Sequence, residues 1–309
     1  MAAAHAHGIK ASVSIGGWVE RRDCSQQLRT LFVKTLVNFA KKYNLDGLDF
    51  DWEYPASQEI GCNTMNANDA ANFLAFIQEL RADPVGSKLV LSTASAIFPF
   101  TNRRGNPSAD VSAFSKVLDY IAIMNYDINA PEKFQAGSAV SGVKAWNAAG
   151  IPLNQLVLGV ASYGHSFSVS KADAFKKGSK TQIALYSSFN ASVAPAGDAW
   201  DDVAGVDDCG NFAAQGGVIN FWGLIQQGYL TKKGAPVEGV PYLFDNCTQT
   251  PYYVYNTTTE AVISFDNAQS FAAKGIYIKS KGLGGFSMWE AGGDSNDILL
   301  DSIREAAWF

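Results

Sequence analysis

The sequence predicts an α/β protein built on a parallel sheet, and three observations carry this prediction. Short apolar runs alternate with amphipathic helical segments along most of the chain. One of these runs, residues 45–55, carries acids at every second position near its end. The length of 309 residues and the hydrophobic content of 47% suit one large barrel, or a domain with a substantial insertion.

In the first half of the chain, predicted helices and strands follow one another in turn. The helical segments repeat apolar residues at intervals of three and four, and the strands are apolar runs bounded by turn-forming residues. Glycines close the first helix and the first strand, where the backbone must turn sharply. The predicted order is helix 2–7, strand 10–14, helix 28–43, strand 45–55, a helix from Asn66 or Asn68 to just before Pro84, strand 88–94, helix 110–118, strand 120–125, helix 138–148 and strand 155–161.

The alternation breaks after Phe167 and resumes near the C-terminus. Residues 168–263 are rich in Gly, Asn, Asp and aromatic residues, and they contain short strand-like runs at 240–244 and 251–255. We interpret this stretch as a small inserted α+β lobe. The chain then continues with helix 267–279, strand 285–289 and helix 294–308, which brings the predicted strands of the main sheet to six.

The run at 45–55 reads Leu-Asp-Gly-Leu-Asp-Phe-Asp-Trp-Glu-Tyr-Pro. Because side chains alternate between the two faces of a strand, Asp49, Asp51 and Glu53 share one face. The other face is apolar and carries Leu48, Phe50 and Trp52. Desolvation and mutual repulsion should raise the pKa of at least one carboxyl group, and the last acid can then hold a proton for a leaving group. The alternative is a set of helix caps or ligands for a structural cation, but the strict spacing of two favours a strand.

The amino-acid composition indicates which kinds of binding partner the protein has. The formal net charge of −5 argues against a nucleic acid. The longest apolar runs are broken by Gly, Ser, Asn or Asp, so no membrane span is predicted. A neutral, polar polymer fits better, and the 12% aromatic content suits either stacking against sugar rings or a large core.

Cysteines and glycosylation sequons favour an extracellular location. The even number of cysteines suggests two disulfides, one in each half of the chain, from Cys24, Cys62, Cys209 and Cys247. Sequons for N-glycosylation begin at Asn190, Asn246 and Asn256. The first residues lack the basic segment and the apolar run of a signal peptide. His5 and His7 could form a metal pair, but so close to a chain end we interpret them as surface residues.

The segment Asp-Gly-Leu-Asp-Phe-Asp-Trp-Glu at 46–53 resembles the signature of glycoside hydrolase family 18, the chitinases. Four other segments resemble motifs of the same family, namely Ser-Ile-Gly-Gly-Trp at 14–18, Met-Asn-Tyr-Asp at 124–127, Gly-Val-Ala-Ser-Tyr-Gly at 159–164 and Gly-Phe-Ser-Met-Trp at 285–289. The resemblance implies a (β/α)8 TIM-type barrel formed by residues 1–167 and 264–309, with the lobe at 168–263 inserted between the last two strands. Family members have two further strands before the Ser14 segment, so we expect an N-terminally incomplete barrel of six βα units.

The resemblance also implies roles for individual residues. Glu53 would donate a proton to the glycosidic oxygen, while the N-acetyl oxygen of the substrate attacks the anomeric carbon in place of an enzyme nucleophile. Asp51 would orient that acetamide group, and Asp49 beneath it would share the proton of Asp51. Tyr126 would hydrogen-bond the acetamide carbonyl, and Asp127 would contact the sugar and tune the acid.

Six more residues would contact the substrate, chitin or a chitooligosaccharide. Trp289 would form the floor under the reacting sugar, and the rest would line the cleft, namely Gly17, Trp18, Tyr54, Met124 and Tyr163. Each aromatic residue among them could instead belong to the core. His165 stands where many family members have arginine. The resemblance implies no metal and no cofactor, and we expect a monomer in which Cys24 pairs with Cys62 and Cys209 with Cys247.

Three other functions stay open at this point. A chitin-binding lectin can use the same scaffold, although such proteins typically lose the acid that this chain keeps as Glu53. An enzyme of the same family could act on N-glycan cores, but the long insertion favours chitin. An inactive fragment is the third alternative.

Overall fold

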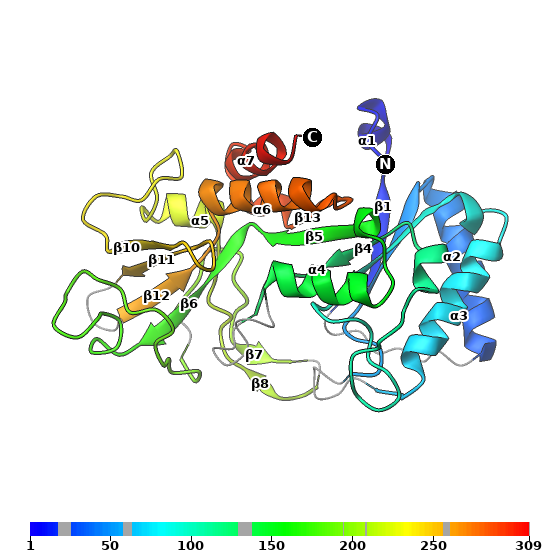
Figure 1. Ribbon diagram of the computed structural model, residues 1–309, viewed down its shortest axis with the longest axis horizontal. Helices are drawn as coiled ribbons and strands as arrows, with labels where there is room; N and C mark the ends of the chain where they lie inside the picture. Colours follow the sequence, from blue (N-terminus) through cyan, green and yellow to red (C-terminus); the bar gives the residue numbers. More distant parts are fainter. Residues whose placement is uncertain are drawn as a thin grey trace. The chain divides into compact units, whose positions relative to one another are not determined.

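The computed structural model describes residues 1–17, 26–57, 64–128, 138–193, 195–207, 209–255 and 260–308 (Figure 1). Two compact units make up the chain. The first comprises residues 1–159 and 282–287, and the second comprises residues 160–281 and 288–309. Among the described residues, no helix is both long enough and apolar enough to span a membrane.

The first unit is built on the predicted parallel sheet. Its strands run in the order β1-β2-β3-β4-β5-β13, and the pairs from β1 to β5 are parallel. The strands are β1 Ser12–Gly17, β2 Gly47–Trp52, β3 Val90–Ser95, β4 Tyr120–Ile123, β5 Leu156–Ala161 and β13 Gly285–Trp289, of which the last two continue into the second unit. All six strands predicted for the main sheet are therefore present, in the arrangement of an incomplete TIM-type barrel.

The helices of the first unit connect these strands as predicted, with one exception. They are α1 Ala2–Ala6, α2 Gln26–Tyr43, α3 Asp69–Ala82 and α4 Ala139–Ala148. Asn68 takes the N-cap position of α3, and the Ser138 side chain caps α4 by accepting from the Ser141 N–H. The helix predicted at 110–118 is wrong, since only a 3-10 turn forms there, at Phe114–Lys116. The backbone bonds of this segment mostly run three residues back, as from the Phe114 N–H to the Val111 carbonyl at 3.0 Å. The Gln155 side chain donates to the Ser115 and Leu118 carbonyls, which an α-helix continuing through this segment would use for its own bonds.

Aromatic side chains fill the space between this sheet and its helices. Phe73 on α3 is 2% exposed. Its ring centroid lies between 5.7 and 6.4 Å from those of five other rings, Phe50, Trp52, Phe76, Phe100 and Phe114. Phe50 and Trp52 are the apolar face of β2, so the core holds the face of the strand that lies opposite its acids.

The second unit is organised around an antiparallel sheet with the order β10-β11-β12-β6-β9. Its strands are β6 Tyr163–Val169, β9 Val218–Asn220, β10 Tyr242–Asp245, β11 Thr250–Tyr255 and β12 Glu260–Ser264, and a separate hairpin joins β7 Gly205–Val206 to β8 Phe212–Ala213. The helices are α5 Phe221–Gln226, α6 Ala268–Lys281 and α7 Ile298–Ala307. A methyl group on Gly275 of α6 would lie only 2.6 Å from the Ile303 carbonyl oxygen, so α6 and α7 pack backbone to backbone.

The predicted pairing of Cys209 with Cys247 is wrong. Cys209 follows β7, whereas Cys247 lies in the turn between β10 and β11, where it is a free, exposed cysteine. The Cys247 N–H donates to the Asp245 carboxylate at 3.1 Å, so the turn is held by a hydrogen bond. Cys24 and Cys62 lie outside the described residues.

We predict that Phe73→Ala destabilises the protein by about 3–5 kcal/mol, because it leaves a cavity among five rings. Urea unfolding followed by circular dichroism measures the change. The control is Phe39→Ala on α2, where the ring is 38% exposed and where we expect a loss of less than about 1 kcal/mol. Equal losses in the two variants would contradict the central place given to Phe73.

Candidate active site

The acids of β2 lie on the face of the strand opposite the aromatic core. In the register of the sheet, Asp49 stands between Ser14 on β1 and Ser92 on β3. The Ser14 hydroxyl donates to one oxygen of Asp49 at 2.7 Å, and the Ser92 hydroxyl donates to the other at 2.6 Å. The two serines therefore fix the orientation of the Asp49 carboxyl group within the sheet.

Glu53 follows directly after β2, and its surroundings shift the pKa of its carboxyl group upward. Burial, above all, raises the pKa of Glu53 to about 7. The negative charge of Asp51, a hydrogen bond between the two carboxyl groups and the charge of Asp127 add to the increase, while a hydrogen bond with Tyr54 opposes it. A hydrogen bond between two carboxyl groups requires a proton on one of them. Glu53 and Asp51 therefore form a pair that keeps a shared proton up to near neutral pH.

Two further residues reach this pair from the segment after β4. Burial raises the pKa of the Tyr126 hydroxyl, and the charges of Asp51 and Asp127 add to this effect, so Tyr126 remains a neutral hydrogen-bond donor. The backbone of Asp127 is left-handed, with φ 57°, which is uncommon outside glycine and concentrates at functional sites. The structure thus brings Asp49, Asp51, Glu53, Tyr54, Tyr126 and Asp127 into one interacting group.

Two residues of this site were not predicted from the sequence to act in it. Ser92 supports Asp49, and its place on the inner face of β3 follows from the alternation of that strand once the register is known. Gly159 on β5 allows Tyr126 to lie close to the sheet. A methyl group there would lie 2.3 Å from the Ile123 carbonyl oxygen and 3.0 Å from the Tyr126 ring. Only glycine fits this contact without a shift of the backbone.

The other predicted substrate contacts are distributed over both units. Met124, in the first unit, donates its N–H to the Ser95 carbonyl at 2.9 Å and so prolongs the pairing of β4 with β3. Gly17 ends β1 with φ 131°, and Trp18 lies outside the described residues. Trp289 and Tyr163 belong to the second unit, where the indole is 59% exposed and the phenol ring is buried.

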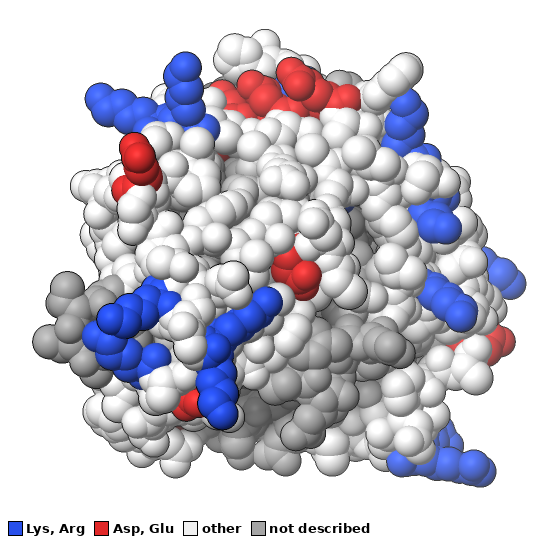
Figure 2. Space-filling model, turned by 60° about the vertical axis from the view of Figure 1, so that its left-hand side comes forward, with Lys and Arg blue, Asp and Glu red and all other residues white. Residues whose placement is uncertain are grey.

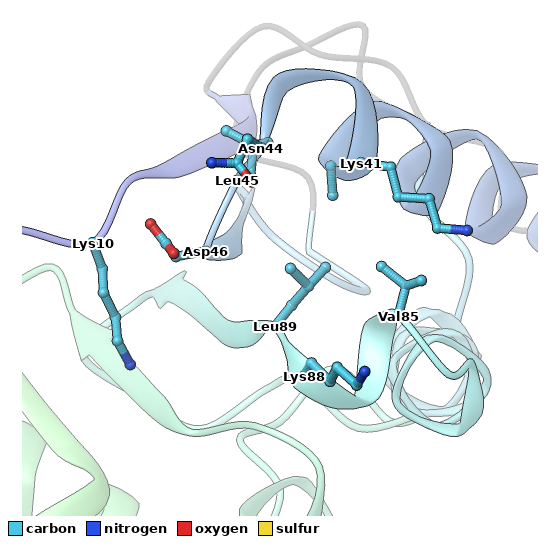
Figure 3. Close-up of a pocket in the computed structure, with 9 residues that line it drawn as sticks. Lys10, Lys41, Asn44, Leu45, Asp46, Val85, Lys88 and Leu89 are labelled. Carbon is cyan, nitrogen blue, oxygen red and sulfur yellow. The ribbon is translucent and has the colours of Figure 1, made fainter. Parts of the chain in front are cut away.

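A cavity of about 310 Å³ lies in the first unit at the N-terminal ends of the strands, which is the end of the sheet away from Asp51 and Glu53 (Figure 3). Its lining residues include Lys10, Asp46 and Leu89, each of which directly precedes a strand or lies within two residues of its start. The Ala11 N–H and His5 both hydrogen-bond the Asp46 carboxylate at 2.7 Å, and these contacts lower its pKa. Asp46, the first acid of the signature, therefore joins the N-terminal segment to β2, remote from the acids at the other end of the strand.

On the described part of the face in Figure 2, lysines and arginines form small separate groups between uncharged areas. This distribution agrees with the net charge of −5. Among the described residues, no group of three or more His, Cys, Asp and Glu side chains could hold a metal ion.

Known proteins with the same architecture resemble the chain over nearly its whole length. The crystal structure of a chitinase from Rhizomucor miehei matches with a TM-score of 0.86 and 31% identity, over 99% of this chain and 86% of that one. Chitinase A1 of Niallia circulans is 29% identical over 96% of this chain and 42% of its own length. A chitinase-like effector of Moniliophthora perniciosa is 51% identical over 99% of this chain and 74% of its own length.

The family assignment follows from these comparisons together with the site. The family model of glycosyl hydrolases family 18 matches residues 1–294. That range contains both the strand with the acids and the segment after β4 that reaches them. The chain therefore belongs to glycosyl hydrolase family 18, with the chitinases as its relatives.

Proposed function

We propose that this protein is a retaining chitinase that hydrolyses β-1,4 bonds between N-acetylglucosamine units. The observation that carries the proposal is the carboxyl pair of Glu53 and Asp51, which keeps a proton to near pH 7 at the C-terminal end of β2. Active sites of TIM barrels lie at this end of the strands. Two solved structures of chitinase mutants from the plant Cycas revoluta, which share the fold, carry bound oligomers of N-acetylglucosamine, and we extend that class of ligand to this chain.

In the proposed reaction, the Glu53 proton passes to the glycosidic oxygen as the bond from that oxygen to the anomeric carbon breaks. The acetamide oxygen of the same sugar forms the new bond to that carbon, which gives a cyclic, positively charged intermediate. Asp51 stabilises this charge and orients the acetamide, and the Tyr126 hydroxyl donates to the acetamide carbonyl. Glu53 then takes a proton from a water molecule as the oxygen of that water bonds to the anomeric carbon and the bond from this carbon to the acetamide oxygen breaks. The two successive displacements retain the configuration at the anomeric carbon.

Binding without hydrolysis is the second candidate function. Two relatives, 51% and 48% identical, are named chitinase-like effectors rather than chitinases. In this second function, the chain would bind chitooligosaccharides without cleaving them. Against this alternative, the chain keeps an acid with a raised pKa at position 53.

We also propose that the protein acts outside the cell as a glycoprotein. Two of the three sequons, at Asn190 and Asn246, fall in the described part of the chain, and both asparagines are exposed. Exposed loop asparagines are accessible for glycosylation in a secreted protein.

We predict that Glu53→Gln lowers the kcat for a fluorogenic chitooligosaccharide by at least about 10²-fold, because the amide cannot donate a carboxyl proton. Substrate binding, measured by isothermal titration calorimetry, should stay close to that of the parent. Glu238→Gln, which makes the same change at an exposed position, is the control and should leave kcat unchanged. Full hydrolysis by Glu53→Gln would disprove the catalytic role, and a parent protein that binds without cleaving would favour the second function.

A second prediction concerns Asp51. Asp51→Asn should reduce kcat by about 10²-fold, because a neutral amide stabilises the developing positive charge less than a carboxylate does. The same kinetic assay, together with titration of the bound oligosaccharide, separates this loss from weaker binding. A kcat equal to that of the parent would refute the orientation of the acetamide by Asp51.

The pH dependence supplies a third prediction. Since the reaction needs protonated Glu53, kcat/KM should fall as pH rises through about 7, the raised pKa of this group. Asp127→Asn removes a negative charge that raises this pKa, so the alkaline limb should move to lower pH. Glu238→Gln again serves as control. If Asp127→Asn leaves the limb in place or moves it upward, the assignment of the limb to Glu53 is incorrect.

A further inference from the structure

One of the exposed tryptophans of the second unit, Trp200, lies on a loop that is fixed by hydrogen bonds on both sides. Trp200 is 61% exposed, yet both carboxylates that flank it in the loop are engaged in hydrogen bonds. Asp201 is 9% exposed and accepts hydrogen bonds from the Gly197 N–H, the Gln215 side chain and the Val218 N–H, each at 2.9 Å. These bonds fix the loop on the C-terminal side of the indole.

Asp198 fixes the loop on the N-terminal side. Its carboxylate accepts from the Trp200 N–H at 2.8 Å, from the Asn220 N–H at 2.5 Å and from the Asn220 side chain at 3.0 Å. Asn220 is itself 5% exposed, at the end of β9. The position of Trp200 is therefore set by the folded unit, and binding through its indole requires little ordering of the backbone.

The indole of Trp200 rests on the segment that follows Trp289. A methyl group on Gly292 would lie 3.1 Å from the Trp200 ring, so the ring packs on the backbone of the 3-10 turn Ala291–Gly293. On another side, the Trp222 ring lies 5.4 Å away at 71°. Trp289 itself is 59% exposed, and only two residues separate it from Gly292 in the sequence. The second unit thus carries one largely exposed indole just before the 3-10 turn and another, that of Trp200, packed on that turn.

An exposed indole held in a fixed position offers a large apolar ring face together with a polar N–H group, and both can contact a partly apolar ligand. The ring faces of an N-acetylglucosamine unit expose C–H groups, so a sugar can cover an indole while its hydroxyl groups remain in water. The net charge of −5 does not oppose such a neutral ligand.

We propose that Trp200 is a sugar-stacking residue of the second unit, separate from Trp289, and that it contacts one N-acetylglucosamine ring of a bound chitooligosaccharide. This inference rests on the proposed function, because it takes the ligand class from there. It extends the binding region to a loop that the sequence motifs do not include.

The test uses the full chain with Glu53→Gln, which prevents turnover, and calorimetric titration with N-acetylchitotetraose. Adding Trp200→Ala should weaken binding about tenfold, the size of effect expected when one aromatic contact is lost. The matched control is Trp308→Ala, which removes another exposed indole, 79% exposed at the end of α7, and should leave the affinity unchanged. Trp200→Tyr keeps an aromatic ring and should restore most of the affinity. This second variant tests stacking at position 200 without the loss of the whole ring in Trp200→Ala.

The possible results separate the two proposals. If the chain without changes at Trp200 binds tetraose but Trp200→Ala binds as tightly as Trp308→Ala, Trp200 makes no sugar contact and this inference alone fails. Failure of Trp200→Tyr to restore binding would overturn it as well, because a stacking role needs only a ring face. If the chain with intact Trp200 binds no chitooligosaccharide, both the proposed function and this inference fail.

Discussion

The structure of the first unit depends on one strand that separates two incompatible environments. Along β2, every second side chain is a carboxylate and the side chains between them are apolar. The apolar side is buried in a cluster of aromatic rings, whereas the acids face the other way. A shift of register by one residue would place the acids in the aromatic core and the rings in the site. The alternation of this one strand therefore fixes both the core and the chemistry.

The carboxylates differ in how the fold treats them, and this difference gives each a distinct role. Asp49 has a serine donor on each oxygen, and these two hydrogen bonds fix the position of its carboxyl group. The pKa of Glu53, which follows the strand directly, is raised mainly by burial and by the negative charge of Asp51, and both favour the neutral form of Glu53. Carboxyl groups at intervals of two along one strand thus meet different surroundings, and only Glu53 has surroundings that suit the proton donor of the proposed reaction.

The sequence was most informative where the period of the side chains is strict. The six strands of the main sheet follow from the alternation of apolar runs with helical segments, and the acidic face of β2 follows from the alternation of its side chains. The sequence was least informative where a residue distant in the chain decides the local structure. The segment at 110–118 has a helical pattern, but the Gln155 side chain takes two of its carbonyl groups, and the sequence does not show that Cys247 lies in a turn away from Cys209. The roles of Ser92 and Gly159 likewise depend on strand neighbours, which the sequence order alone does not give.

The proposed catalytic groups and the exposed indoles belong to different units of the fold. The acid pair and its supporting residues lie within residues 1–159, whereas Trp200 and Trp289 lie in the second unit. Under the proposed function, a substitution of Glu53 should therefore change hydrolysis without altering the hydrogen bonds of Asp198 and Asp201 that position Trp200. Because the proposed proton transfer depends on this one side chain, overall identity to a relative, even at 51%, does not by itself separate hydrolysis from binding alone.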